Sequence, residues 1–264
     1  MKRFTALVLC FLPISLYAQQ ASPAPSPGAP SLDVLLDRLY AYAAQYRATL
    51  PSLSCDESIV SQELKKGKVE WQVTAEGTIR ELRTENPDDP FTEQHQFQTV
   101  DGKKAPKGTF RLPYLIQGGF ANLTGFHHEA LRDCFDYRLS RLGGDLVQLE
   151  LDLKPDSDNP GCRKIYPGMH WLVRADARTG HILHSERQLS AEVSEQHHEA
   201  YFASLDYEPQ QLGDRTFWLP VKFFAHSPDD DRRMYATYSN CHRYAGEMKI
   251  LPGFAPVSPA PNPQ

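Results

Sequence analysis

Residues 216–244 read TFWLPVKFFAHSPDDDRRMYATYSNCHRY, two strand-like segments on either side of an acidic turn. In the first segment, apolar side chains occupy every second position from Phe217 to Phe223. In the second segment, alternate positions from Tyr235 to Cys241 share one face. Side chains that alternate with a period of two point to opposite faces of a strand. The two segments are therefore predicted to pair as an antiparallel hairpin.

The same alternation recurs along the chain before this hairpin. It extends over residues 69–81, and it returns in 135–153 around a Gly-Gly-Asp turn, in 171–184 around Asp-Ala-Arg-Thr-Gly, and in 201–207. Strands joined by short turns pair antiparallel, and a long antiparallel sheet curls. We therefore predict an α+β, mainly β fold. A curved antiparallel sheet or a half-open β-barrel is expected, covered by an N-terminal helix.

One helix is predicted before the first strand. Ser31 can accept a hydrogen bond at the helix N-terminus, and Leu50-Pro51 ends the helix. Apolar side chains between these limits recur at helical spacing: Leu32, Leu35, Leu36, Leu39, Ala43 and Tyr46. Such an apolar stripe packs against a core, so the helix is expected to cover the concave face of the sheet.

The first residues have the character of an export signal. Residues 1–18 combine a basic start, an apolar middle and a small residue, Ala18, before a plausible cleavage point. A spacer rich in Pro, Ala and Ser follows at 19–30, and a similar Pro-rich tail occupies 252–264. We expect a single β-rich domain over 31–251, in the periplasm or outside the cell. No transmembrane segment is expected in the mature chain, because no other segment is apolar enough.

The charge of the chain argues against a nucleic-acid partner. Loss of the predicted signal would remove Lys2 and Arg3 and no acidic residue, so the formal net charge would change from −5 to −7. Nucleic-acid binding depends on clustered lysine and arginine side chains. The short basic run at Lys103-Lys104 is expected to be a solvated turn.

An even number of cysteines follows the predicted signal: Cys55, Cys134, Cys162 and Cys241. An even count in an exported protein favours disulfides. A zinc site would need closely spaced ligand pairs such as Cys-x-x-Cys, which the sequence lacks. Of the three possible pairings we favour Cys134–Cys162, because each of these residues lies beside a neighbouring strand pair. Cys55–Cys241 would then join the start of the sheet to its last strand.

Three features of the chain resemble the periplasmic outer-membrane lipoprotein carriers, the LolA/LolB-like superfamily. An export signal precedes an amphipathic helix, and residues 170–188 read HWLVRADARTGHILHSERQ with an Asp-x-x-Thr-Gly turn. The final hairpin carries Trp218-Leu219-Pro220 and Tyr238-Ser239-Asn240. The resemblance, that of a distant member, implies an incomplete β-barrel wrapped around helices. It also implies a hydrophobic cavity that holds acyl chains of lipoproteins or other lipids.

Side chains that would line such a cavity are large, and lie on the predicted helix and strands. They are Leu36, Tyr40, Trp71, Trp171, Trp218, Phe223 and Tyr238. Core packing is the alternative role for the three tryptophans. The predicted function is that of an exported cell-envelope protein that binds a hydrophobic small molecule or acyl chain. Neither catalysis nor a cofactor is expected, and an envelope protein is a further candidate partner.

Two other functions stay open at this point. The sheet could pack solidly and present its surface to a partner protein, as a scaffold does. A metal-dependent hydrolase would instead use the His127/His128 and His197/His198 pairs, because imidazole nitrogen is a zinc ligand. Neither pair has the His-Glu-x-x-His spacing that places two ligands on one helix face. The sequence also lacks a Gly-x-Ser-x-Gly nucleophile motif, so we expect no enzyme and no metal site.

Overall fold

The computed structural model describes residues 30–86, 90–106, 110–116, 120, 129–154, 159–229 and 231–244, apart from the side chain of Lys164. The predicted signal peptide and the tail at 252–264 lie outside the described residues, as does all of the spacer except Pro30.

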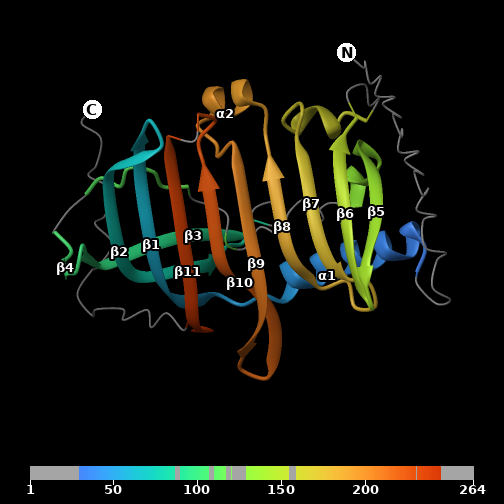
Figure 1. Cartoon of the computed structure of the whole chain (residues 1–264). Coiled ribbons are helices and arrows are strands. Elements are labelled where there is room, and N and C mark those ends of the chain that lie inside the picture. The colour runs from blue at the N-terminus through green and yellow to red at the C-terminus, as the bar shows by residue number, and fades with distance from the viewer. Residues whose placement is uncertain are drawn as a thin grey trace, which may run out of the picture.

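One helix precedes a long series of strands, in the order that the alternation predicts (Figure 1). The elements are α1 (Leu32–Thr49), β1 (Leu53–Lys65), β2 (Lys68–Arg83), β3 (Phe91–Val100), β4 (Lys103–Lys104), η1 (Glu129–Cys134), β5 (Phe135–Gly143), β6 (Leu146–Leu153), η2 (Cys162–Lys164), β7 (His170–Asp176), β8 (Ile182–Gln188), α2 (Ala191–His197), β9 (Phe202–Leu212), β10 (Arg215–His226) and β11 (Arg232–Arg243). The short helix α2 was not expected from the sequence. Ser190 caps it by accepting a hydrogen bond from the backbone N–H of Val193 at 3.3 Å.

The strands of the described residues form one antiparallel sheet. Its order is β4-β3-β2-β1-β11-β10-β9-β8-β7-β6-β5, so β11 lies between β10 and β1. The sheet curves strongly, with β2 and β3 turning behind the strands at its centre (Figure 1). The predicted curved antiparallel sheet is confirmed. The sheet is open rather than a closed barrel, because β4 and β5 are edges that no described strand joins.

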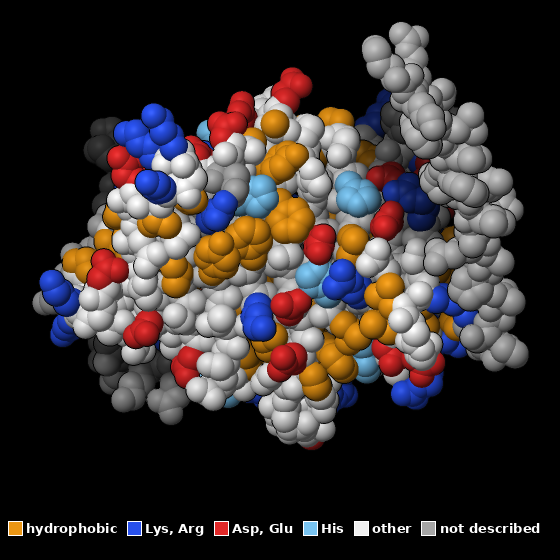
Figure 2. All heavy atoms as spheres, viewed as in Figure 1, with side chains coloured by type: hydrophobic (Ala, Val, Ile, Leu, Met, Phe, Trp, Pro, Cys, Tyr) orange, Lys and Arg blue, Asp and Glu red, His pale blue; other side chains and the backbone are white. Residues whose placement is uncertain are grey.

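The outer face of the sheet, which points away from α1, carries a group of aromatic side chains. Phe202, Phe224, His226 and Tyr235 form this outer aromatic cluster, with ring centroids 4.8 Å apart for Phe224 and Tyr235 and 5.4 Å apart for Phe202 and His226. Figure 2 shows hydrophobic side chains gathered over β10 and β11 on this face. Tyr235 is 40% exposed. This cluster is the described surface that the scaffold alternative would use.

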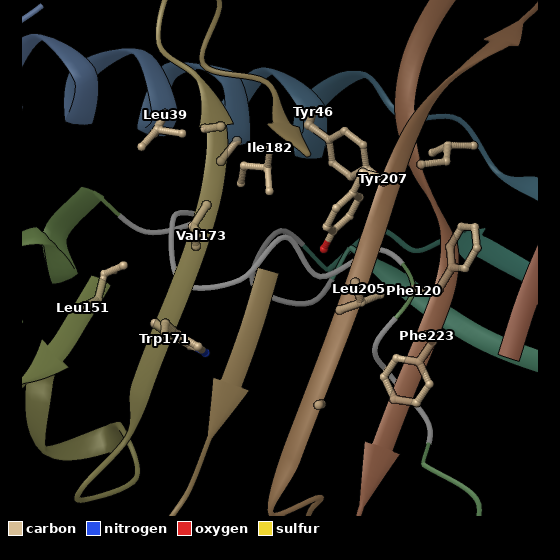
Figure 3. Packing of buried hydrophobic residues seen from close by; sticks show 14 of the residues in the cluster. Leu39, Tyr46, Phe120, Leu151, Trp171, Val173, Ile182, Leu205, Tyr207 and Phe223 are labelled. Carbon is tan, nitrogen blue, oxygen red and sulfur yellow. The ribbon is translucent and has the colours of Figure 1, made fainter. Parts of the chain in front are cut away.

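The inner face of the sheet forms the core together with α1. Alternate residues of the strands are buried on this face, as Leu53, Cys55 and Ile59 are in β1. Leu39 and Tyr46 point from α1 toward the strands that carry Ile182 and Tyr207 (Figure 3). Ser31 caps the helix as expected, accepting from the backbone N–H of Val34 at 3.4 Å. In the described part of the chain, no helix has the length and apolar character needed to cross a bilayer.

The Asp-x-x-Thr-Gly turn between β7 and β8 holds α1 in place. Asp176 Oδ1 accepts hydrogen bonds from two backbone N–H groups of the turn, at 3.0 and 2.8 Å. The turn then offers the carbonyl of Ala177, which accepts from Arg38 Nη1 of the helix at 2.6 Å. Gly180 has a φ of +77°, and a Cβ at this position would lie 2.7 Å from the carbonyl oxygen of Arg38. The glycine therefore permits both the turn and the close approach of the helix.

Both disulfides join the cysteines in the pairing that the sequence favoured. Cys55 of β1 is bonded to Cys241 of β11, with Cα atoms 4.1 Å apart and a sequence separation of 186. Cys134 is bonded to Cys162, with Cα atoms 5.3 Å apart and a separation of 28. In the chain-entropy model a cross-link that closes a longer loop restricts the unfolded chain more, by about 5 against about 4 kcal/mol here. The longer loop is the one that unites the two ends of the domain.

Gly180→Ala should destabilise the protein more than Gly102→Ala. The two glycines have similar positive φ values, +77° and +70°, so alanine strains the backbone at either position by about 1–2 kcal/mol. At position 180 the new Cβ would also collide with the backbone of α1, whereas no described atom lies within 4 Å of it at position 102. We expect roughly a further 1–3 kcal/mol of loss for Gly180→Ala. Urea unfolding measures both variants, and equal losses would contradict the role of the turn in docking α1.

Candidate ligand-binding site

Most of the predicted cavity residues lie in the buried core on the concave side of the sheet. They are Leu36, Tyr40, Trp171, Phe223 and Tyr238. Neighbouring side chains contact them closely. Tyr40 Oη lies 3.1 Å from the hydroxyl of Tyr137, and the ring of Trp171 is centred 5.3 Å from that of Phe135. These residues therefore belong to the packed core of the domain.

The other two tryptophans lie elsewhere. Trp218 is half-buried, and its ring is centred 5.1 Å from the imidazole of His181. Trp71 lies near the turn between β1 and β2 and is 36% exposed, with the guanidinium of Arg111 5.9 Å from its ring centroid. The structure does not bring Trp71 together with the other candidates. Trp71 is on the same face of β2 as the buried residues of that strand. It is nevertheless exposed, because the strand extends beyond the core at this end.

A pocket of about 430 Å³ opens between the C-terminal half of α1 and the hairpin of β9 and β10. It is lined by Tyr42, Gln45, Tyr46, Thr49, His181, Arg215, Thr216 and Phe217. We name it the mouth pocket, because it lies where the contact between helix and sheet reaches the surface. Small-molecule sites have volumes of about 300–1,000 Å³, so the mouth pocket is large enough to hold part of a ligand.

Aromatic rings continue from the mouth pocket toward the core. The ring of Tyr42 meets the imidazole of His181 edge-on at 4.9 Å, and Tyr46 meets Phe217 edge-on at 6.3 Å. Burial lowers the pKa of His181 and raises the pKa of Tyr42 and Tyr46. All three rings are therefore uncharged near neutral pH. The rings at the inner end of the mouth pocket are thus neutral, whereas most of the surface that the pocket exposes is polar.

A second feature of the concave side is ionic. His95 Nδ1 of β3 lies 2.8 Å from Glu57 Oε2 of β1, and His95 Nε2 lies 2.9 Å from Glu93 Oε1. None of the three side chains is more than 8% exposed. We name this group the ionic cluster. The second oxygen of Glu57 is buried and has no hydrogen-bond partner among the described residues.

The two glutamates hold His95 in its charged form. Burial alone would lower the pKa of His95, but hydrogen bonds to Glu57 and Glu93 and their negative charges raise it to about 10. Burial, and then the charge of Glu57, raises the pKa of Tyr238. His95 is therefore a cation at neutral pH, inside the domain.

The sequence offered one signal for the ionic cluster. Glu93 and His95 are polar and read as a solvated face, but they share the parity of Phe91 and Phe97 in the same strand. Two phenylalanines at the ends of one face indicate that the face points inward. Polar residues between them then need buried partners.

The described residues include no group of three or more His, Cys, Asp or Glu side chains that could hold a metal ion. His197 ends α2, where its ring lies 4.8 Å from that of Tyr166. His198 follows as the left-handed C-cap of that helix, with a φ of +56°. His127 and His128 lie outside the described residues.

No family model and no curated protein matches the chain. It is similar to the solved structure of a DUF1329 family protein from Desulfovibrio piger, with 13% identity and a TM-score of 0.43, covering 80% of this chain and 94% of that one. A domain named for outer membrane lipoprotein sorting, from Vibrio parahaemolyticus, has 10% identity and a TM-score of 0.41, covering 78% and 92%. A LolA superfamily protein from Nitrosomonas europaea has 12% identity and a TM-score of 0.33, covering 84% and 97%. These neighbours include the group that the sequence resemblance named.

His95→Gln should lower the free energy of unfolding by about 3–5 kcal/mol near pH 6–7, because it leaves buried carboxylates without their cation. The pKa of His95 rises from about 6.5 in the unfolded chain to about 10 in the folded one. Its contribution is therefore complete below about pH 6.5 and is lost as the pH rises through about 10. The stability difference between the wild-type protein and the variant should narrow over that range.

Denaturant unfolding at a series of pH values measures this difference. His242→Gln is the matched control, because His242 lies exposed on β11. Its stability difference from the wild type should stay small and constant. A difference for His95→Gln that does not change with pH would contradict the ionic cluster.

Proposed function

We propose that this chain is an exported cell-envelope protein that binds a lipid or acyl chain at the mouth pocket, beside α1, and catalyses no reaction. The observation that carries the proposal is the mouth pocket itself, which places a volume of about 430 Å³ beside aromatic side chains that belong to the apolar core. Small-molecule sites combine apolar surface with a few polar groups; the exposed lining of the mouth pocket is mainly polar, and its apolar part lies at the inner end. The two disulfides support export, because disulfides persist in oxidising compartments.

The size of the ligand follows from the energy of burial. Each methylene removed from water contributes about 0.8 kcal/mol, and a micromolar dissociation constant corresponds to about −8 kcal/mol. Roughly ten buried methylenes are therefore needed before the costs of association are counted. A long acyl chain meets this requirement. Phe217 and Tyr46 supply the apolar surface at the inner end of the pocket.

Gln45→Trp should weaken the binding of a fluorescent fatty acid about tenfold or more, because the indole would occupy the mouth pocket. Gln45 lines the pocket and is exposed, so the substitution leaves the core intact. Ala44→Trp is the matched control, since Ala44 is also exposed on α1 but is not part of the lining. It should bind like the wild type. Fluorescence titration of delipidated protein measures the dissociation constants.

Organic extraction of the purified protein followed by lipid mass spectrometry tests the same proposal independently, with an expected release of lipid. Absence of bound lipid together with no uptake of the probe would refute it. Tyr235→Ser, in the outer aromatic cluster, should leave binding unchanged. If Tyr235→Ser abolished binding and Gln45→Trp did not, the ligand would lie on the outer face instead.

A further inference from the structure

Arg215 places a positive charge on the rim of the mouth pocket. The lining of the pocket contains two basic side chains, Arg215 and His181. Burial lowers the pKa of His181, so Arg215 is the one that is charged at neutral pH. Its sequence neighbour Asp214 pairs with Arg243 instead, at 3.2 Å. Within the described part of the chain, no carboxylate lies within ion-pair distance of the Arg215 guanidinium. The charge is therefore available to a ligand.

The end of α1 does not use this charge either. The last carbonyl groups of a helix carry partial negative charge and attract cations. Here the carbonyls of Arg47 and Leu50 accept hydrogen bonds from Arg83 Nη1, at 2.8 and 2.9 Å. The C-terminal end of α1 therefore already has a cation bound to it, Arg83 of β2. Arg215 lies on the hairpin of β9 and β10, in a chain whose net charge is −5.

Uncharged polar groups complete the rim. The Thr49 hydroxyl donates to the carbonyl of Gln45 at 2.8 Å, and the Thr216 hydroxyl donates to Gln211 Oε1 at 2.8 Å. Both hydroxyl protons are therefore already used within the protein. Of the exposed side chains at the rim, the amide of Gln45 and the guanidinium of Arg215 are left as donors for a ligand, beside the half-buried imidazole of His181. Two donors at the rim and aromatic surface below match a molecule that is polar at one end.

We propose that the mouth pocket takes an amphipathic ligand whose head group is an oxyanion, a carboxylate or a phosphate, bound by Arg215. The acyl chain of the same ligand lies against Phe217 and Tyr46. A guanidinium presents N–H groups in a planar fork that matches two oxygens of an oxyanion. This inference rests on the proposed function, because it names the head group of the ligand that the same pocket binds.

The test compares four probes of equal chain length on delipidated full-length protein: a fatty acid, an alkyl phosphate, a fatty alcohol and an alkyltrimethylammonium ion. The wild-type protein should bind the two anions about tenfold or more tighter than the alcohol, because hydrogen bonds to charged groups are the stronger ones. Arg215→Gln should abolish that preference and leave the affinity for the alcohol unchanged. Arg215 is exposed, so the variant should fold normally. Arg141→Gln, at an exposed arginine of β5, is the matched control and should keep the preference.

The outcomes separate the two levels of the proposal. Equal affinity of the wild-type protein for fatty acid and alcohol would overturn the oxyanion head group and leave lipid binding intact. A preference for anions that survives in Arg215→Gln would overturn the assignment to Arg215. Binding of none of the four probes would overturn both levels. Tighter binding of the fatty acid supports a free fatty acid as the source of the oxyanion, and tighter binding of the alkyl phosphate supports a phospholipid.

Discussion

Pairing of β11 with β1 makes one sheet from two runs of strands, β1–β4 and β5–β11, and within each run neighbours in the sheet are also neighbours along the chain. The partners lie far apart in sequence, and the bond between Cys55 and Cys241 spans 186 residues. Closing so long a loop costs chain entropy. The disulfide keeps the loop closed in the unfolded chain as well, so folding no longer carries this entropy cost. The concave face exists because the two runs are joined. Since α1 ends at Thr49 and β1 begins at Leu53, the position of the helix on that face also follows from this join.

The ionic cluster lies beside the same join, next to a shift in the register between β2 and β3 at Glu76 and Gly77. Glu57 is the register partner of Tyr238 across the join and of Gly77 on its other side. His95 reaches Glu57 from β3, across β2, and so it needs the strands to approach closely at this point. A Cβ at Gly77 would lie 2.2 Å from the carbonyl oxygen of Gln96. The missing side chain of Gly77 therefore brings β3 near enough to neutralise a buried carboxylate, which would otherwise be costly.

The parts of the structure that could be predicted from the sequence are those that depend on neighbours along the chain. Period-two alternation and short turns indicated the hairpins, helical spacing indicated α1, and an even cysteine count with the strand order indicated both disulfides. The ionic cluster could not be read in this way, because Glu57 and His95 meet across an intervening strand. The mouth pocket was missed for a similar reason. Its lining combines residues 42–49 with residues 215–217, which come together only when α1 lies across the sheet.

The contacts of α1 limit the routes by which the proposed ligand would reach the protein. The helix is held near its start by Arg132, which pairs with Asp33 and Asp37, in its middle by Arg38 on the turn before β8, and at its end by Arg83. Three polar attachments along its 18 residues hold α1 against the strands and turns beside it. Under the proposed function, a ligand would enter beside the helix, where α1 meets the hairpin of β9 and β10. That position is the mouth pocket, so the same attachments that fix the helix also fix the geometry of the opening.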